Sequence, residues 1–585
     1  MLVTPQNISD VIHKLNVVTT IALDTESSGL EETDKAFAVI VATETEEFYF
    51  DFRSVSNFVS YLHPILQQDN LTVIMQNAKF DIRMLASIGL TIGGKIIDIK
   101  SVARVVRNDH FEGGYSLAAQ AKRELGRSKG DDIIKETIKK KGLFDTRRDY
   151  FGTHYDVPQY DKVPMDLMHT YACLDARLTY DLYKKYLPSL DQGSARVARL
   201  EAQLIPVCYK MERLGLRLDV GHTIKAMHHE SSIVEINKDK YAKLTGTKFV
   251  NSAKSISKHL DYTLPLTEDG NPSLTDSVLE SIITLGSPKD KEIADTVRLI
   301  RLYDKRVSTY YRSYLNLMDK NNIIHPTMHI AGTRTGRFSY SDPNLQNQPK
   351  EEDTEYHIRQ CFIPRPGRKF VSIDYQAQEY RMMADYAGET ELIKQVMSGK
   401  DLHQSTADMM GVTRKQAKTI AFLILYGGGD AKLADALGVD IYKAKSMRNK
   451  FFSVLPKVQL FVDNVIATGR SRGYVVNWLG RRLYADKEFC YALPNHLIQG
   501  GCADVMKKAM VEIDKFIQDK DISMVISVHD EIVFEVGEDC MKYIPDIQNI
   551  MENVYPSKNG MILKTSASYS SKSLASKDME KYDRH

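Results

Sequence analysis

Apolar and polar positions follow two different periods along the first third of the chain. Short apolar runs at 19–24, 47–52 and 71–76 predict buried strands, and the spacing of apolar residues at 79–88 and 171–187 predicts helices. Because the predicted strands and helices alternate, we expect an α/β domain over roughly the first 190 residues.

The pattern changes twice farther along the chain. Between about 195 and 320 apolar residues recur at helical spacing, with a loop-rich insertion around 245–290. From about 325, Gly, Pro, Asn, Ser and Thr become frequent, which predicts an ordered loop region. We expect a strand at 368–374 and then a helix-rich stretch to about 515.

The clearest hairpin pattern lies at 522–536, where apolar residues alternate on both sides of a polar turn. We expect that turn at His529, Asp530 and Glu531. The last segment, 565–585, is rich in Ser and Lys, and we expect it to be loosely held.

Composition narrows the class of protein. The chain has 585 residues, which at roughly 150 residues per domain suggests about three or four domains. It is 43% hydrophobic and 26% charged, which excludes wholesale disorder. Its 78 basic and 76 acidic residues leave a net charge of +2, so any binding to nucleic acid must come from local patches.

Cysteine usage and apolar runs indicate the compartment. The six cysteines are scattered and form no C-x-x-C pair, which disfavours a zinc site and a disulfide framework and favours a reducing compartment. The first residues lack a signal-peptide pattern, and no run of 18 or more apolar residues occurs. We therefore expect a soluble cytoplasmic protein without membrane association.

Acidic residues form a first candidate site near the N-terminus. Asp24 and Glu26 lie two residues apart at the end of a predicted strand, so their side chains share one face. Such a pair can hold a hard divalent cation, but it also occurs in exposed acidic turns. Two further pairs lie four residues apart, on one face of a helix: Asn77 with Asp81, and Tyr171 with Asp175. Each of these pairs alone fits capping or packing equally well.

In this order and at these spacings the residues resemble the three motifs of DEDD-type 3′→5′ exonucleases. The resemblance implies that four acids bind two Mg²⁺ or Mn²⁺ ions and that Tyr171 orients the attacking water. The implied metal ligands are Asp24, Glu26, Asp81 and Asp175. Cations also answer a physical need, because clustered carboxylates repel one another.

A second candidate site lies in the C-terminal half. Asp374 and Asp530 each lie where a predicted strand stops, which is also a common place for an Asp without a function. Between them, Thr413 is a candidate N-cap of a helix that the glycines at 427–429 would end. A stripe recurs every four residues along this helix: Arg414, Lys418, Phe422 and Tyr426. A basic start and an aromatic end suit a ligand with a polyphosphate and a flat base, although a solvated cationic turn beside an aromatic core contact would give the same pattern.

The loop at 333–349 contains side chains that could contact phosphates, sugars and base edges. They are Arg334, Arg337, Asn344, Gln346 and Asn347. The alternative interpretation is a turn network whose polar groups bond to one another.

Together these segments resemble family A DNA polymerases, the bacterial polymerase I type. The matching motifs are T-x-T-G-R-F-S-x-S-x-P-N-L-Q-N-x-P at 333–349, DYQAQEYR at 374–381, R-x-x-x-K-x-x-x-F-x-x-x-Y-G at 414–427, NHLIQGGCAD at 495–504 and VHDE at 528–531. The resemblance implies a ribonuclease H-like α/β exonuclease domain followed by an α+β right-hand polymerase domain. The implied domains are the exonuclease (1–195), the thumb (196–325), the palm (326–387 and 496–585) and the fingers (388–495).

The resemblance also implies a role for each matched position. Asp374 and Asp530 would hold two Mg²⁺ or Mn²⁺ ions, with Glu531 auxiliary. The implied dNTP contacts are Arg414, Lys418 and His403 at the triphosphate, Phe422 and Tyr426 at the base, and Glu379 against a 2′-hydroxyl. The implied contacts to primer-template DNA are Arg337, Asn344, Gln346, Asn347, Gln499 and His529, with Lys305, Arg306, Ser308 and Thr309 in the thumb.

Two features depart from bacterial relatives. The family run after the first palm aspartate is Y-S-Q-x-E, whereas this chain has Ala377 at the Gln position. Only 23 residues precede Asp24, so we expect no 5′-nuclease domain and a phage-like polymerase with a proofreading exonuclease. Accessory replication proteins would be further partners, and 245–290 is the candidate contact segment.

Three other functions fit parts of the sequence. A nuclease whose C-terminal half merely binds DNA is disfavoured by the intact acid pair and the stripe. A single-subunit RNA polymerase is disfavoured by Glu379, and a scaffold without activity is disfavoured because two complete acid sets remain.

Overall fold

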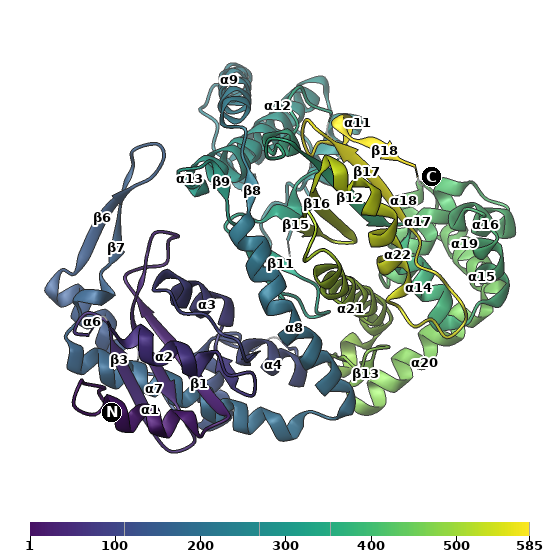
Figure 1. Cartoon of the computed structure of the whole chain (residues 1–585). Helices are drawn as coiled ribbons and strands as arrows, with labels where there is room; N and C mark the ends of the chain where they lie inside the picture. The colour runs from purple at the N-terminus through teal and green to yellow at the C-terminus, as the bar shows by residue number, and fades with distance from the viewer. Residues whose placement is uncertain (56, 110, 131, 268, 351–352, 584–585) are drawn as a thin grey trace.

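The computed structural model describes residues 1–55, 57–109, 111–130, 132–267, 269–350 and 353–583. Helix α8 (Gln192–Leu214) runs between an N-terminal region and a larger C-terminal region (Figure 1). The expected α/β domain and the helix-rich part that follows it are confirmed.

The N-terminal region is built on a five-stranded sheet in the order β3-β2-β1-β4-β5. Strand β1 pairs antiparallel with β2 and parallel with β4. The strands are β1 (Thr20–Ser27), β2 (Ala36–Ala42), β3 (Glu47–Asp51), β4 (Thr72–Met75) and β5 (Lys95–Asp98). The helices are α1 (Ile8–Asn16), α2 (Phe58–Leu66), α3 (Ala78–Ser87), α4 (Ile99–Val106), α5 (Leu117–Gln120), α6 (Asp132–Lys141) and α7 (Met165–Tyr186).

Strand β1 separates two apolar cores, and its alternation places the acids. Ile21 and Leu23 belong to the core shared with α8, whereas Ala22 belongs to the core that contains α7. Asp24 and Glu26 continue the phase of Ala22, so they lie on the face that α7 covers.

The middle of the chain, which is the region expected to be the thumb, is mainly helical, as predicted. Its helices are α9 (Val220–Thr245), α10 (Ala253–Ile256), α11 (Asp276–Leu285), α12 (Pro288–Lys305), the π-helix η5 (Arg306–Arg312) and α13 (Ser313–Leu317). Short pairs of strands lie outside the two main sheets. The pair of β6 (Phe144–Arg148) and β7 (His154–Pro158) belongs to the N-terminal region, and farther along the chain β8 (Leu216–Arg217) pairs with β9 (Ile323–Ile324) and β10 (Thr327–His329) with β11 (Ser339–Ser341).

The C-terminal region is built on an antiparallel sheet in the order β15-β16-β12-β17-β18. Its strands are β12 (Arg368–Tyr375), β15 (Ile522–Val528), β16 (Glu531–Gly537), β17 (Thr565–Ser570) and β18 (Glu580–Tyr582). The predicted strand and hairpin are confirmed, but Glu531 already belongs to β16, so the turn is shorter than expected.

The expectation of a loosely held tail is wrong. Strand β17 pairs with the central strand β12 from Phe370 opposite Ser570 to Tyr375 opposite Thr565. The hydroxyl of Ser566 donates a hydrogen bond to Asp374. The Ser-rich composition therefore reflects small side chains next to the strand that carries Asp374, not a solvated end of the chain.

Helices surround this sheet, and Figure 1 shows a cluster of them beside it. They are α14 (Gln378–Ala387), α15 (Thr390–Met397), α16 (Leu402–Met410), α17 (Arg414–Leu425), α18 (Asp430–Leu437), α19 (Ile441–Val454), α20 (Pro456–Arg472), α21 (Leu493–Phe516) and α22 (Ile544–Asn553). The hairpin of β13 (Tyr474–Val476) and β14 (Arg482–Tyr484) interrupts the helix-rich stretch and was not predicted.

The domain boundaries stay predictions, and two of them fall inside continuous helices. The boundary at 195/196 lies in α8, and the one at 495/496 lies in α21. Within the described ranges no single helix is long and apolar enough to cross a bilayer, while the bent pair α19 and α20 passes that test by length and composition alone.

Candidate active sites

The first acidic site forms where β1, α3 and α7 meet. Asp24 and Glu26 come from β1, Asp81 from the first turn of α3, and Asp175 from α7. Asp81 and Asp175 are 2% and 4% exposed, so these carboxylates are almost removed from water. The structure brings together all four acids that the exonuclease resemblance selected.

Burial and mutual repulsion hold these acids toward their protonated forms. Burial raises the pKa of Asp24 to about 8, with a further contribution from Asp175. Burial also raises the pKa values of Glu26 and Asp81 well above their usual range, and the charge of Asp24 adds to both shifts. Such a set gains most from cations that accept oxygen ligands, so its chemistry fits hard divalent ions.

Two of the acids are turned toward protein groups. Asp81 Oδ1 accepts hydrogen bonds from the backbone nitrogen of Thr25 at 3.1 Å and from its hydroxyl at 2.7 Å. Asp175 Oδ2 lies 2.8 Å from the ammonium of Lys129. Accordingly, the described residues contain no ready-made metal cage of three or more His, Cys, Asp or Glu side chains.

Lys129 is a member of this site that sequence reasoning missed. Its ammonium also lies 5.1 Å from the ring centroid of Tyr171. Burial lowers the pKa of Lys129, but the charge of Asp175 and the Tyr171 hydroxyl outweigh burial and raise it overall. Lys129 lies in a loop before α6, where the sequence has no periodic pattern. The sequence could have pointed to it only indirectly, because four clustered acids need a basic partner.

The second acidic site lies at one edge of the C-terminal sheet. Asp374 is near the end of β12, opposite Glu531 of β16. The backbone nitrogen of Tyr375 donates to the carbonyl of Asp530 at 3.1 Å, which places the two aspartates on neighbouring strand ends. Burial, together with the nearby Asp374, raises the pKa of Asp530 to about 6. Lys350 Nζ lies 3.8 Å from Asp374 Oδ2.

Helix α17 carries the predicted stripe. Thr413 and Gln416 form a capping box at its start, which confirms the predicted N-cap. The rings of Phe422 and Tyr426 stack with centroids 6.4 Å apart. At the other end, the guanidinium of Arg414 donates to both carboxylate oxygens of Asp401, at 3.0 and 2.8 Å.

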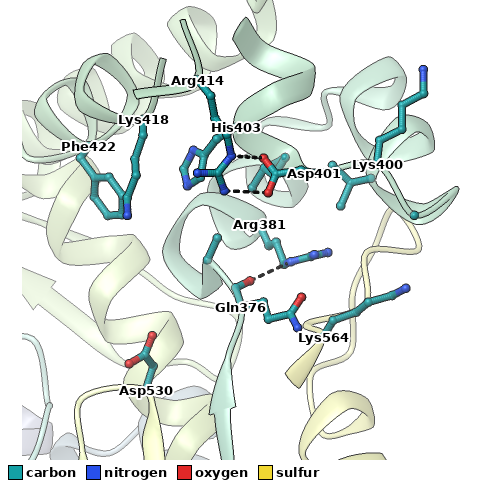
Figure 2. Close-up of a pocket in the computed structure, with 14 residues that line it drawn as sticks. Gln376, Arg381, Lys400, Asp401, His403, Arg414, Lys418, Phe422, Asp530 and Lys564 are labelled. Atoms are coloured by element: carbon teal, nitrogen blue, oxygen red, sulfur yellow. Dashed lines mark hydrogen bonds and ion pairs between the residues drawn. The ribbon is translucent and has the colours of Figure 1, made fainter. Parts of the chain in front are cut away.

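A pocket of about 600 Å³ lies between α17 and the sheet edge (Figure 2). Arg414, Lys418 and Phe422 line it from the helix, and Asp530 lines it from the sheet. His403 lines it as well, and burial lowers its pKa to about 4, so its imidazole is neutral at pH 7. The pocket thus joins the two parts of the sequence that predicted a nucleotide site.

A polar triad connects helices α14 and α17 to the loop at 333–349. Glu379 Oε1 accepts hydrogen bonds from Arg337 and from the hydroxyl of Tyr426, the latter at 3.4 Å. Ala377, the position that departs from the family, lines the pocket and has a φ of +50°, a left-handed conformation uncommon for a residue with a side chain.

The loop residues predicted to contact DNA are partly used within the protein. Asn344 Oδ1 accepts from the backbone nitrogen of Gln346 at 3.1 Å and caps the short helix η6 (Leu345–Asn347). The carbonyl of Asn347 accepts from Tyr310 at 2.7 Å. The alternative interpretation, a self-bonded turn, therefore holds for these groups, whereas Gln499 on α21 and His529 in the β15–β16 turn lie outside that network.

The thumb residues that were predicted to contact DNA also include both exposed side chains and one that is used within the protein. Lys305, Ser308 and Thr309 are exposed. Arg306 is 4% exposed and donates to both carboxylate oxygens of Glu230, at 2.8 and 2.7 Å. The charge of Arg306 is already satisfied inside the protein, so a contact with duplex phosphates would require this ion pair to open.

Known protein families match both regions of this chain. The sequence profile of DNA polymerase family A matches residues 223–573, and that of a 3′-5′ exonuclease matches residues 1–191. The chain is 26% identical to a DNA polymerase of Mycobacterium phage L5 over 88% of this chain and 86% of that one. It is 25% identical to DNA polymerase DpoZ of Salmonella phage PMBT28, over 93% of this chain and 95% of that one.

Bacterial relatives are longer, and the solved structures show the same fold. The chain is 26% identical to DNA polymerase I of Chloroflexus aurantiacus over 94% of its own length, but it spans 60% of that relative. A solved structure, the POL domain of Pol1 from M. smegmatis in complex with DNA primer-template and dNTP, superposes with a TM-score of 0.83 at 21% identity, covering 98% of this chain and 99% of that one. The chain belongs to DNA polymerase family A.

Proposed function

We propose that this chain is a DNA-directed DNA polymerase that extends a DNA primer on a DNA template with dNTPs, and that its N-terminal region removes nucleotides from the 3′ end. The observation that carries the proposal is the pocket in which Arg414, Lys418 and Phe422 of one helix face Asp530 of the sheet. A triphosphate needs cations at one end of its site and metal-binding oxygens at the other, and this pocket supplies both.

In the polymerase site, Asp374 and Asp530 would hold two Mg²⁺ or Mn²⁺ ions, which activate the primer hydroxyl and neutralise the triphosphate. Arg414 would exchange Asp401 for the triphosphate, and Lys418 would add a second cation. Neutral His403 would donate or accept a hydrogen bond at the same phosphates, and Phe422 would pack on the nucleotide.

Glu379 would select deoxyribonucleotides. Its carboxylate is held by Arg337 and Tyr426, so it cannot move away from a ribose 2′-hydroxyl without breaking both contacts. Arg337, Gln499 and His529 would contact the primer-template, together with the loop at 333–349 and the exposed thumb residues Lys305, Ser308 and Thr309.

In the exonuclease site the four acids would hold two divalent ions, which supply an activated water and stabilise the departing oxygen. The donors are Asp24, Glu26, Asp81 and Asp175. Tyr171 would orient the water, since its ring lies beside Lys129 and Asp175 at the rim of the site. We also place this activity in the cytoplasm of a bacterial host, because relatives of similar length belong to bacteriophages.

The test uses an end-labelled primer annealed to a longer template, with Mg²⁺, and with dNTPs, rNTPs or no nucleotide. The proposal expects extension with dNTPs, little with rNTPs and shortening without nucleotide. Shortening without any extension would instead support a nuclease that merely binds DNA, and equal use of rNTPs would support an RNA polymerase.

A further inference from the structure

The N-terminal region touches the loop at 333–349 through a short segment that follows α4. The amide nitrogen of Asn108, in that segment, donates hydrogen bonds to the carbonyl of Thr333 at 2.7 Å and to the carbonyl of Arg334 at 2.9 Å. Because both acceptors are carbonyl oxygens, only the amide nitrogen can serve them, which fixes the orientation of the Asn108 side chain. A residue of the exonuclease region is thus bonded to the main chain of the loop that carries Arg337.

The segment that carries Asn108 is itself held in place. The hydroxyl of Tyr115 donates to the carbonyl of Arg107 at 2.6 Å and accepts from the backbone nitrogen of Asp109 at 2.8 Å. One side chain therefore fixes the residues on both sides of Asn108. Asn108 is 3% exposed, so water does not compete for its two hydrogen bonds. The contact between the two regions is buried and ordered at this point.

On the other side of the contact, the carbonyl of Thr333 closes a tight turn. It accepts a second hydrogen bond, from the backbone nitrogen of Gly336 at 3.1 Å. Gly336 has a φ of +84°, a conformation that favours glycine. A Cβ at this position would lie 2.7 Å from the guanidinium carbon of buried Arg481, so the turn has no room to shift in that direction.

This turn leads directly into Arg337. The hydroxyl of Thr333 donates to the carbonyl of Arg337 at 3.4 Å, and the guanidinium of Arg337 donates to Glu379. Glu379 is the residue proposed above to exclude a ribose 2′-hydroxyl. A continuous series of hydrogen bonds therefore runs from Asn108 through the turn at 333–336 to the carboxylate that would select the sugar.

We propose that Asn108 is a positioning residue for the polymerase site: its amide holds the turn at 333–336, so that Arg337 stays directed at Glu379 and deoxyribonucleotides are selected. This inference rests on the proposed polymerase function. Without the amide, two carbonyls lose their donor and the turn gains freedom, so Glu379 is held less firmly against a 2′-hydroxyl. The exonuclease region thereby supports the selectivity of the other site through a side chain outside its own acidic cluster.

The test compares dNTP and rNTP incorporation in primer extension, in an Asp24→Ala background that prevents removal of the new end. Asn108→Ala removes both hydrogen bonds, and Asn108→Leu removes them while it keeps a side chain of similar volume, in case the cavity left by alanine prevents folding. We expect the ratio of kcat/KM for dNTPs to that for rNTPs to fall by about fivefold in both variants, the factor that corresponds to one buried hydrogen bond.

The matched control is Tyr484→Phe. It removes another contact between the same two regions, the hydrogen bond from the Tyr484 hydroxyl to the carbonyl of Val106 at 3.0 Å, but leaves the bonds of Asn108 in place. The nucleotide ratio should change by less than about twofold in this control. Forms of all three variants that keep Asp24 should degrade single strands at the parent rate, which shows that the exonuclease region remains folded.

A second background separates positioning from a general loss of structure. In Glu379→Ala, addition of Asn108→Ala should change the nucleotide ratio by less than about twofold, because the residue through which Asn108 acts is gone. An unchanged ratio in both Asn108 variants, or an equal fall in Tyr484→Phe, would overturn the positioning role, and so would a fall that persists without Glu379. Absence of primer extension by the parent protein, or its equal use of both nucleotide types, would instead defeat the proposed function.

Discussion

The two acidic sites of this chain handle negative charge in opposite ways. In the exonuclease site Asp81 and Asp175 are 2% and 4% exposed, and the pKa of Asp24 is raised to about 8. In the polymerase site the side chain of Asp374 is 36% exposed, and the pKa of Asp530 is raised only to about 6. The buried site contains its own counter-charge, Lys129, whereas the open site is flanked by Lys350 at 3.8 Å.

This difference follows from what each site must accept. In the buried cluster the fixed Lys129 offsets part of the charge of the acids before any cation binds. An open site that binds a triphosphate needs cations that can be released, and Arg414 is held by exposed Asp401 until the ligand arrives. We therefore expect the two sites to fail separately and to respond differently to pH.

The largest effect should come from removing one acid from each site. Asp530→Ala should abolish primer extension and leave degradation of single strands intact, and Asp24→Ala should do the reverse. Each loss should reach about a thousandfold, because ion-mediated charge stabilisation contributes several kcal/mol. The labelled primer assay measures both activities; extension that survives Asp530→Ala would remove that residue from the site.

A change at Phe422 should alter which nucleotides the open site accepts. Phe422→Tyr adds a hydroxyl to a ring that lines the nucleotide pocket, where it can replace the contact that a missing 3′-hydroxyl leaves unmade. We expect dideoxynucleotide incorporation to rise by about tenfold relative to dNTPs, the size of one hydrogen bond in a buried setting. Termination ratios on a sequencing template measure this, and equal ratios in both proteins would place Phe422 away from the sugar.

Removal of Lys129 should leave the N-terminal acidic site more negative and strengthen its binding of divalent ions. Lys129→Met leaves Asp175 without its 2.8 Å partner, so divalent ions face less competition for that carboxylate. In an Asp530→Ala background we expect Mn²⁺ to bind about three- to fivefold more tightly, as measured from free Mn²⁺ by electron paramagnetic resonance. Lys122→Met, at an exposed position of the same segment, is the control. Weaker Mn²⁺ binding would show that Lys129 supports the metal site.

The smallest effect concerns stability against pH without metal. A carboxyl whose pKa is higher in the folded protein binds its proton more tightly there, so its contribution is complete below the unfolded pKa and is lost as pH rises. Asp24 should lose its contribution to stability between pH 3.8 and about pH 8, and Asp530 should lose its contribution between pH 3.8 and about pH 6. With a chelator, the unfolding temperature should fall across the first of these pH ranges.

In Asp24→Asn the unfolding temperature should decrease less steeply with rising pH, up to about pH 8. In Asp530→Asn the slope should change only below about pH 6. Addition of Mg²⁺ should restore stability at pH 8, because the ions bind the ionised acids. An unfolding temperature that rises from pH 5 to 8 in the chelator would contradict the assignment of buried, proton-binding acids.

Much of this could be predicted because the decisive residues follow regular periods. Asp24 and Glu26 share a strand face, and Arg414, Lys418 and Phe422 share a helix face, so sequence spacing alone places each set. Strand β2 is a short apolar run of the same kind as those at 19–24 and 71–76, but it was not predicted, and such a run cannot be told from a buried helix by its period alone.

Long-range partners had no such signal. Lys129 reaches Asp175 across 46 residues, Ser566 reaches Asp374 from the chain end, and Glu230 takes Arg306 out of solvent. In each case the outcome depends on which segments the fold brings together, and not on a repeating pattern.

The most direct test of two separate metal sites is a crystal of this protein with primer-template DNA and a non-hydrolysable dNTP analogue in Mn²⁺. The account predicts anomalous density beside Asp374 and Asp530 and also beside Asp24 and Glu26, with Asp24→Ala removing the second set alone. Anomalous density absent from both places, with the DNA and nucleotide bound, would contradict it.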